Sequence, residues 1–385
     1  MNLTKTFFAA FFLITSISFS QGKPTDFLSK EFHKTRREAF RAKMPKNSVA
    51  VFFSNPIRNR ANDVDYVFHQ DPNFYYLTGY RETNTVLLIF SEMQKTEKGT
   101  YNELIYVQKK NPRAEMWNGV RLGIEGVQKE LGFKNAFNGE DFKNIAVDFT
   151  SFDKVMFKDF KNDIRDTRDK ADLYDLISQF KSKIGYKVAT SKIPTSDKNI
   201  KIASNLDTKT LHQIMADLRE VKTKDELVLL KKAVRISAMG QIEVMKAMHP
   251  NMSETEVQGV HEFVYKKYGA EYEGYPSIVG GGNNGCILHY TENSKTALGK
   301  ELVLMDLGAE YRGYTADVTR TIPANGKFSK EQKAIYDLVY RAQEAGIAQY
   351  VIGGKISTPG QTARKIINEG LVKLGIIKSV KERHL

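Results

Sequence analysis

Two aspartates in the second half of this 385-residue chain could bind a cation together. Asp306 directly follows the apolar run Leu302–Met305, and Asp317 lies within a run rich in β-branched residues, Tyr314–Ile322. Both runs are typical of β-strands, and Gly313 between them can adopt the positive φ that a three-residue hairpin loop with a bulge requires. The spacing therefore predicts a hairpin in which the two carboxylates lie opposite or diagonal to each other.

Facing carboxylates repel each other, and burying them without a partner in so apolar a hairpin would be costly. A metal ion, or a pair of ions, held between them would remove both penalties. The spacing alone leaves an alternative open, because each aspartate could cap a turn or pair with the nearby Arg320. His289 adds a third polar side chain that favours the metal hypothesis. It follows the apolar residues Ile287 and Leu288 and lies within Cys286–Tyr290, which is predicted to be a strand.

The segments around these residues, GYPSIVGGGNNGCILHYTEN (274–293) and LVLMDLGAEYRGYTADVTRTIPANGKFS (302–329), closely resemble the catalytic domain of aminopeptidase P. That family comprises Xaa-Pro aminopeptidases of the pita-bread metallopeptidase group. The resemblance implies that Asp306 and Asp317 are ligands of a dinuclear metal centre, with Asp317 contacting both ions. It also implies that His289 holds the substrate or the tetrahedral intermediate, and that the metal is manganese. Carboxylate ligands suit Mn²⁺ and do not exclude Zn²⁺ or Co²⁺.

Two earlier segments, residues 59–80 and 116–123, resemble the N-terminal domain of aminopeptidase P. In the family this creatinase-like domain narrows the cleft and supports oligomers, so the resemblance implies a homo-oligomer. The implied activity is release of the N-terminal residue from peptides with proline at position two. Asp63 and Asp65 do not suggest another metal site, because their spacing does not place them on one helical face and Pro72 argues against a helix.

The sequence departs from the family pattern in one respect. Aminopeptidase P takes further metal ligands from a histidine and two glutamates that follow the region matching residues 370–385. We therefore expect a C-terminally truncated copy that binds metal weakly and lacks peptidase activity. One alternative is a non-catalytic pita-bread protein that binds peptides or proteins. Another is a creatinase-like hydrolase, but such hydrolases lack the metal aspartates, so Asp306 and Asp317 argue against it.

Residues 24–204 are predicted to form an α/β domain, because strand-like and helical segments alternate along them. The strand-like segments are residues 48–53, 85–90, 103–107 and 154–157, and the helical segments are residues 31–42, 123–131 and 171–180.

Residues 205–385 are predicted to form an incomplete α+β domain of the pita-bread type, with helices on both sides of the hairpin. Capping boxes predict helix starts at Thr223, Ser253 and Ser329, and a fourth helix is expected to start at Thr358.

Composition and charge exclude several other classes of protein. A content of 41% hydrophobic and 27% charged residues is typical of a globular protein without disorder or repeats. The net charge of +13 comes from lysines scattered along the chain, so we expect a solvated basic surface and no nucleic-acid partner.

Residues 1–20 are typical of a secretory signal peptide, in which Lys5 precedes an apolar core and small residues precede the expected cleavage at Gln21. The core is too short for a membrane span, so we expect an exported protein, periplasmic or secreted, with no stable membrane span. Cys286 is the only cysteine and cannot form an internal disulfide.

Gly280, Gly282 and Gly285 satisfy the G-x-G-x-x-G pattern of dinucleotide-binding loops. We reject that function because the pattern precedes a predicted strand, whereas a dinucleotide site requires a helix there. The glycines are better explained as positions where the backbone passes close to a neighbouring strand or to a substrate.

Overall fold

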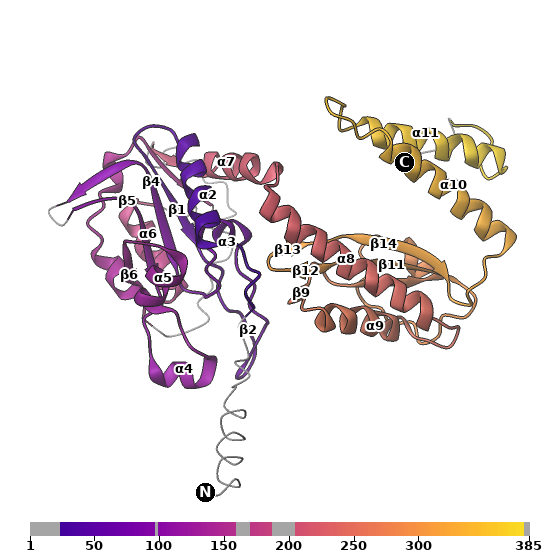
Figure 1. The fold of residues 1–385 in the computed structure, drawn as a ribbon, viewed down its shortest axis with the longest axis horizontal. Coiled ribbons are helices and arrows are strands. Elements are labelled where there is room, and N and C mark those ends of the chain that lie inside the picture. Colours follow the sequence, from indigo (N-terminus) through magenta and orange to yellow (C-terminus); the bar gives the residue numbers. More distant parts are fainter. Residues whose placement is uncertain (1–23, 97–98, 159–169, 187–204, 381–385) are drawn as a thin grey trace, which may run out of the picture. The chain divides into compact units, whose positions relative to one another are not determined.

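The computed structural model describes residues 24–96, 99–158, 170–186 and 205–380 (Figure 1). The chain divides into two compact units, residues 1–227 and 228–385. The predicted signal peptide at residues 1–20 lies outside the described residues. Among the helices of the described ranges, none combines the length and the apolar character that crossing a membrane requires.

The first unit is built around a mixed sheet whose strands lie in the order β6-β5-β4-β1-β7-β8. β4 pairs antiparallel with β1 and β5, whereas β7 is parallel to β1 and β8, and β6 is parallel to β5. β1 is buried along almost its whole length, which explains why its sequence is apolar at every position after Ser48. The strands are β1 (Ser48–Phe53), β4 (Val86–Thr96), β5 (Gly99–Val107), β6 (Ala136–Asn138), β7 (Lys154–Phe157) and β8 (Leu206–Asp207).

Helical segments cover both faces of this sheet, which confirms the predicted α/β architecture. The apolar side chains of one face pack against α2 (Lys30–Lys43), α3 (Pro72–Thr78), α5 (Gly123–Leu131) and α7 (Thr210–Glu220). Those of the other face pack against α6 (Leu173–Lys183) and the 3₁₀ segments η1 (Gly139–Asn144) and η2 (Phe149–Ser151). The short helix α4 (Pro112–Asn118) and the two-stranded ribbon of β2 (Asn59–Ala61) and β3 (Val64–Asp65) complete the unit.

A buried arginine joins three elements of the first unit. Arg37 of α2 is fully buried, and its Nε and Nη2 donate to the carboxylate of Glu103 at 2.9 and 3.1 Å. Its Nη1 donates to the carbonyl oxygen of Leu77 at 2.9 Å, and the guanidinium carbon lies 4.0 Å from the centre of the Phe133 ring. The guanidinium therefore ties α2 to β5 and α3 inside the core.

The inference that Pro72 excludes a helix is wrong, because α3 begins at this proline. The carboxylate of Asp71 accepts hydrogen bonds from the amides of Asn73 and Phe74 at 2.9 and 3.0 Å. Proline is favoured at the first helical position, where its missing N–H would have no partner within the helix. The prediction that Asp63 and Asp65 form no metal site therefore loses this ground and rests on their spacing alone.

The second unit contains two small antiparallel sheets. One has the order β10-β11-β14 and the other the order β13-β12-β9. Their strands are β9 (Tyr272–Glu273), β10 (Ile278–Gly281), β11 (Leu302–Leu307), β12 (Ala309–Tyr311), β13 (Tyr314–Thr315) and β14 (Val318–Pro323).

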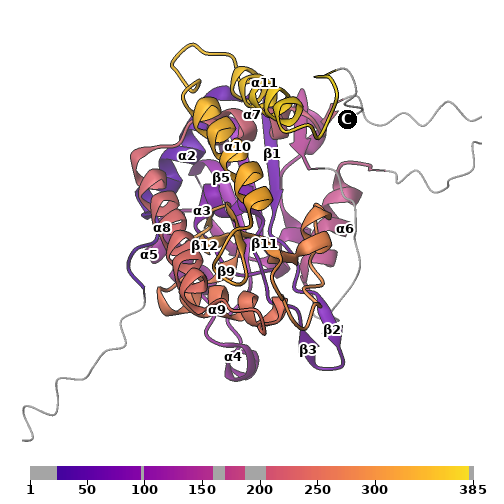
Figure 2. The ribbon, with the colours of Figure 1, turned by 90° about the vertical axis from the view of Figure 1, so that its right-hand side faces the viewer.

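Helices precede and follow these sheets in the chain, as the α+β prediction requires. They are α8 (Lys224–Ala247), α9 (Glu254–Lys267), α10 (Lys330–Ile347) and α11 (Thr358–Lys373), and α10 packs beside α11 (Figure 1, Figure 2). The predicted capping boxes at Thr223, Ser253 and Ser329 are confirmed. α11 begins at the expected residue, Thr358, but no side chain caps it.

A fully buried histidine, His261, packs between α9 and α8. A Cβ atom on Gly240 of α8 would lie 2.9 Å from its Nδ1, so glycine makes room for the ring. Within the described part of the chain neither ring nitrogen has a hydrogen-bond partner, and burial lowers the pKa of His261 from 6.5 to about 4. The imidazole is therefore neutral at pH 7.

Candidate metal centre

The predicted hairpin is present and has two parts. β11 pairs with β14, so that Asp306 lies opposite Thr319, and β12 pairs with β13 beyond them. The turn between β12 and β13 consists of Arg312 and Gly313, with φ of 51° and 84°. The positive φ of Gly313 is confirmed. The loop has two residues rather than the expected three because Arg312 also adopts a positive φ, as in a type I′ turn.

The two parts of the hairpin meet where the backbones approach closely. A Cβ atom on Gly308 would lie only 1.7 Å from the carbonyl oxygen of Ala316, so no larger residue fits without a shift of the backbone. Ala316 donates its amide to Ala309 at 3.0 Å, and Asp317 follows directly, before β14 begins. This close approach fixes the position of Asp317, which lies between β13 and β14, relative to Asp306.

Both aspartates lie near one side chain, Tyr275, because the charges of both raise the pKa of its hydroxyl. Asp306 is opposite Thr319, and Asp317 lies two residues before Thr319, in the link between β13 and β14. Their diagonal arrangement stays a prediction. Asp306 is half-buried and Asp317 is exposed. Among the described residues neither carboxylate forms an ion pair, and Arg320 donates to the carbonyl oxygen of Thr319. The alternative of neutralisation by Arg320 is therefore wrong.

Tyr275 is a site residue that the sequence analysis did not identify. Its hydroxyl donates a hydrogen bond to Oδ1 of Asp306 at 2.5 Å, a length typical of a bond to a charged carboxylate. Burial raises the pKa of Tyr275 well above its ordinary value, and the hydrogen bond to Asp306 and the charges of Asp306 and Asp317 raise it further. The phenol thus remains a proton donor that fixes the carboxylate of Asp306.

His289 lies in an exposed turn, so the predicted strand Cys286–Tyr290 is wrong. Residues 282–286 form a 3₁₀ segment, η3 (Gly282–Cys286), which leads into the turn that carries the histidine. Gly282 has φ of 63°, and the chain folds back so far that a Cβ atom on Gly280 would lie 2.6 Å from the amide nitrogen of Gly285. This close passage is within the segment itself, whereas the approach to a neighbouring strand predicted for the glycines is made by Gly285, whose Cβ would lie 3.3 Å from Cβ of Leu304 in β11.

The donor atoms at this site suit a divalent cation in type. Carboxylate oxygens without a cationic partner are the ligands that hard divalent ions prefer. In number the donors fall short: within the ranges that the structure describes, no group of three or more His, Cys, Asp or Glu side chains could hold a metal ion. His289 therefore does not act as a third ligand beside Asp306 and Asp317.

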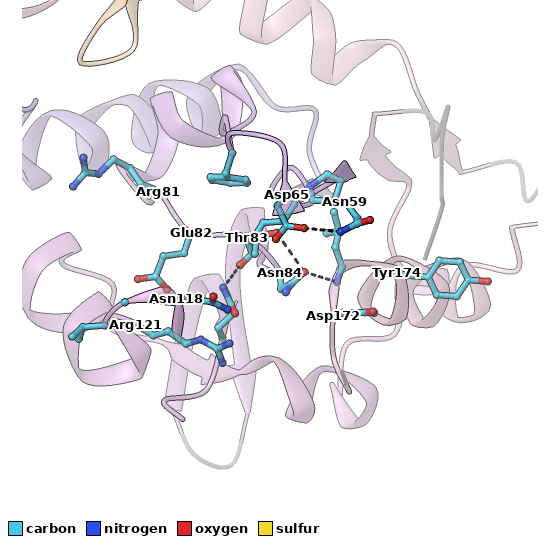
Figure 3. Close-up of a pocket in the computed structure, with 17 residues that line it drawn as sticks. Asn59, Asp65, Arg81, Glu82, Thr83, Asn84, Asn118, Arg121, Asp172 and Tyr174 are labelled. Carbon is cyan, nitrogen blue, oxygen red and sulfur yellow. Dashed lines mark hydrogen bonds between the residues drawn. The ribbon is translucent and has the colours of Figure 1, made fainter. Parts of the chain in front are cut away.

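The first unit contains a cavity of about 300 Å³ that is separate in sequence from these residues (Figure 3). Its lining includes Asn59, Asp65, Asn84 and Gln108. Their polar atoms bond within the protein: Asn59 Nδ2 donates to Asp65 at 3.2 Å, Asn84 accepts from the amide of Leu173 at 2.8 Å, and Gln108 donates to a backbone carbonyl at 3.1 Å. The cavity walls are therefore internally hydrogen-bonded.

Comparison with known proteins relates both units to one group. Residues 228–383 match Metallopeptidase family M24, and residues 33–155 match the aminopeptidase P N-terminal domain. The chain is 34% identical over 353 residues to the Xaa-Pro aminopeptidase of Haemophilus influenzae, an alignment that covers 91% of this chain and 74% of that protein. The Escherichia coli Xaa-Pro aminopeptidase is 29% identical over 357 residues, covering 91% of this chain and 75% of that protein.

Solved structures show the same relationship. The Pseudomonas aeruginosa aminopeptidase PepP superposes with a TM-score of 0.79 at 30% identity, covering 93% of this chain and 76% of that one. Aminopeptidase P from Escherichia coli with the inhibitor Pro-Leu gives a TM-score of 0.77 at 29% identity, covering 92% and 76%. The two-domain fold expected from the resemblance is thus confirmed. The chain belongs to metallopeptidase family M24, in the aminopeptidase P group, with an N-terminal domain followed by a pita-bread domain.

Proposed function

We propose that this protein is a metal-dependent aminopeptidase that releases the N-terminal residue from peptides with proline at position two. The observation that carries the proposal is the pair of carboxylates, Asp306 and Asp317, whose charges both act on Tyr275 and which form no ion pair with a cationic side chain of the described residues. The similarity to proteins described as Xaa-Pro aminopeptidases supports the substrate class.

Each site residue has a distinct role in this proposal. Asp306 and Asp317 would bind divalent ions, which supply Lewis acidity toward the scissile carbonyl group. Tyr275 holds Asp306 through the 2.5 Å hydrogen bond, so this carboxylate does not rotate. His289, exposed in its turn, would donate a hydrogen bond to the substrate oxygen on which negative charge develops.

We propose manganese as the metal, because an oxygen-rich donor set suits Mn²⁺. A zinc-substituted aminopeptidase P from Escherichia coli in complex with product is among the similar structures, so zinc is the natural comparison. With two carboxylates as the donors identified, we expect weak binding, with a dissociation constant on the order of 1 mM.

The proposal is tested on the purified chain after treatment with a chelator. Mn²⁺, Zn²⁺ and Co²⁺ are added separately to the wild type and to Asp306→Asn and Asp317→Asn, and thermal stability and peptide cleavage are measured. We expect the metal to stabilise the wild type and not the variants. Because two carboxylates bind metal weakly, we expect cleavage by this chain to be slow or absent, and any cleavage to require proline at position two. Equal stabilisation of the variants, or cleavage in excess chelator, would contradict the proposal.

We also propose that the protein is exported, which the signal-like composition of residues 1–20 supports. Expression of the full sequence followed by N-terminal sequencing of the exported product should give Gln21 as the first residue. Retention of Met1 in the mature protein would argue against export by this route.

A homo-oligomer is proposed from the resemblance of the N-terminal domain to that of aminopeptidase P. Light scattering coupled to size-exclusion chromatography measures the mass directly, and a mass near the 43.8 kDa of one chain would contradict the proposal.

A further inference from the structure

One buried carboxylate holds the segment that carries His289. Glu254, the first residue of α9, is fully buried, and each of its oxygens accepts two hydrogen bonds. Oε1 accepts from the amide of Gly281 at 2.7 Å and from Nδ2 of Asn284 at 3.0 Å. Oε2 accepts from the hydroxyl of Tyr290 at 2.9 Å and from the amide of Lys295 at 2.8 Å. The four donors come from both ends and the middle of residues 281–295.

Two of the residues that donate hydrogen bonds to Glu254 flank His289 in the sequence. Asn284 and Tyr290 lie on either side of His289, and Asn284 also donates to the Tyr290 hydroxyl at 2.9 Å. The hydroxyl of Tyr290 further accepts from the amide of Ser294 at 3.1 Å. The side chain of His289 is exposed, so its position depends on these neighbours rather than on packing of its own ring.

A second anchor, independent of Glu254, follows the turn. Asn293, at φ of 45°, accepts from the amide of Val279 at 2.9 Å and donates to Gln258 at 2.8 Å and to the carbonyl of Ser277 at 2.9 Å. Its own carbonyl oxygen accepts from Thr255 at 2.8 Å. The base of the segment is thus tied to β10 and α9, whereas the part around His289 relies on Glu254.

The segment lies on the same side of the sheet as the aspartate of β11. A Cβ atom on Gly285 would be 3.3 Å from Cβ of Leu304, so η3 rests on this side chain. Leu304 and Asp306 are two residues apart in β11 and therefore project from the same face. η3, which leads into the turn of His289, therefore packs against the face of β11 that carries Asp306.

The chemistry of the site requires a carboxylate at position 254. Burial alone would raise the pKa of Glu254, but the hydrogen bonds from Gly281, Lys295, Asn284 and Tyr290 outweigh it, so the pKa lies below the ordinary value. An amide in its place would turn one oxygen into an NH₂ group facing two donors, which leaves at least one buried donor without an acceptor.

We infer that Glu254 is a positioning residue for His289, holding residues 281–295 in the shape that carries the exposed imidazole. This inference rests on the proposed function, because it assigns the residue that prepares His289 for that reaction. Glu254 touches neither aspartate in the hydrogen bonds it makes, and it acts through Asn284 and Tyr290.

The experiment compares Glu254→Gln with Glu256→Gln in the full chain. Glu256 is a matched control: it is also a glutamate in the first turn of α9, but it is exposed and its carboxylate caps Ser253. Amide hydrogen exchange of residues 281–295 and the NMR signals of the His289 imidazole, assigned with His289→Gln, are measured without metal or substrate. We expect Glu254→Gln to exchange at least about tenfold faster in this segment and to shift the His289 signals. Glu256→Gln should do neither.

Kinetics provide the readout that a purely structural role would not change. In Glu254→Gln we expect kcat to fall by about 100-fold while KM stays within about threefold, because misplacement of His289 affects the transition state more than binding. Wild-type protein that Mn²⁺ does not stabilise would contradict the proposed function, and the exchange and NMR comparison would still decide the role of Glu254.

Three results would overturn the inference. In the first, Glu254→Gln gives the same exchange rates and the same His289 signals as Glu256→Gln. In the second, amide exchange of residues 281–295 becomes faster in Glu254→Gln but kcat does not fall. If Glu254→Gln does not fold, Tyr290→Phe removes a single bond to Glu254 and is expected to move the same His289 signals to a smaller extent; unchanged signals in that variant would equally refute the role.

Discussion

Replacing Tyr275 by phenylalanine removes one hydrogen bond and leaves the ring in place. The lost bond is the 2.5 Å contact to Oδ1 of Asp306, and a hydrogen bond to a charged group contributes about 1.5–3 kcal/mol to stability. Asp306 is half-buried, so water replaces part of the bond, and we expect a local cost of about 1–2 kcal/mol. That free energy corresponds to a factor of roughly 5–30 in the opening equilibrium.

The assay is amide hydrogen exchange of the peptides that contain β11 and β14, because these strands carry Asp306 and its partner Thr319. Exchange should become roughly 5–30-fold faster in Tyr275→Phe. A Mn²⁺ titration should show a loss of affinity of about 10–100-fold, the usual effect of removing a group that orients a metal ligand. Tyr340→Phe is the matched control, since Tyr340 is exposed on α10.

The reasoning is refuted if Tyr275→Phe and Tyr340→Phe give the same exchange rates and the same Mn²⁺ affinity. A loss of affinity without faster exchange would show that the phenol orients Asp306 without stabilising the hairpin. Faster exchange with unchanged affinity would remove Tyr275 from the metal centre and leave it a structural residue.

Three further predictions concern stability. Gly308→Ala should cost about 3 kcal/mol or abolish folding of the second unit, because its Cβ would lie 1.7 Å from the Ala316 oxygen, whereas Gly259→Ala in the open face of α9 should be neutral or stabilising in the same exchange assay. The pKa of His261 is about 4 in the folded state and 6.5 in the unfolded state, so the unfolded chain binds a proton first as the pH falls, and stability is lost between pH 6.5 and 4. The wild type should therefore lose about 2.5 kcal/mol of unfolding free energy between pH 7 and 4.5 through this residue, and His261→Phe should not show that loss. Urea denaturation at the two pH values measures the difference. Glu103→Ala leaves the Arg37 guanidinium buried without its carboxylate and should cost about 3–5 kcal/mol, measured by hydrogen exchange of β1; an effect below about 1 kcal/mol would contradict the assigned role of the pair.

Local signals in the sequence were sufficient for most of the elements. The predicted strands at residues 48–53 and 154–157 and the helix at residues 123–131 have the observed bounds, because each is set by its own periodicity and flanking residues. The capping boxes at Ser253 and Ser329 formed as predicted, since both partners lie within one turn. Asp306 and Asp317 could be placed on one hairpin because Gly313 marks its turn.

Features that depend on contacts distant in sequence could not be predicted. Tyr275 meets Asp306 only because Ile278 pairs with Asp306 in the register of β10 and β11, and no spacing pattern encodes that register. The apolar residues around His289 resemble a buried strand, yet Leu288 is 85% exposed because the preceding glycines turn the chain outward. The role of Glu254 likewise depends on donors that come together only in the folded unit.

Gly308 divides the hairpin into two parts, so a structural change at the tip of the loop should not be transmitted to the two aspartates. The tip has its own small sheet, in which β12 is held by β9 as well as by β13, and Glu271 binds the Arg312 side chain there. Lengthening the loop beside the exposed Gly313 should therefore leave the spacing of the carboxylates unaltered. The tip is thus a suitable attachment point for a fluorescent label that leaves the neighbouring site undisturbed.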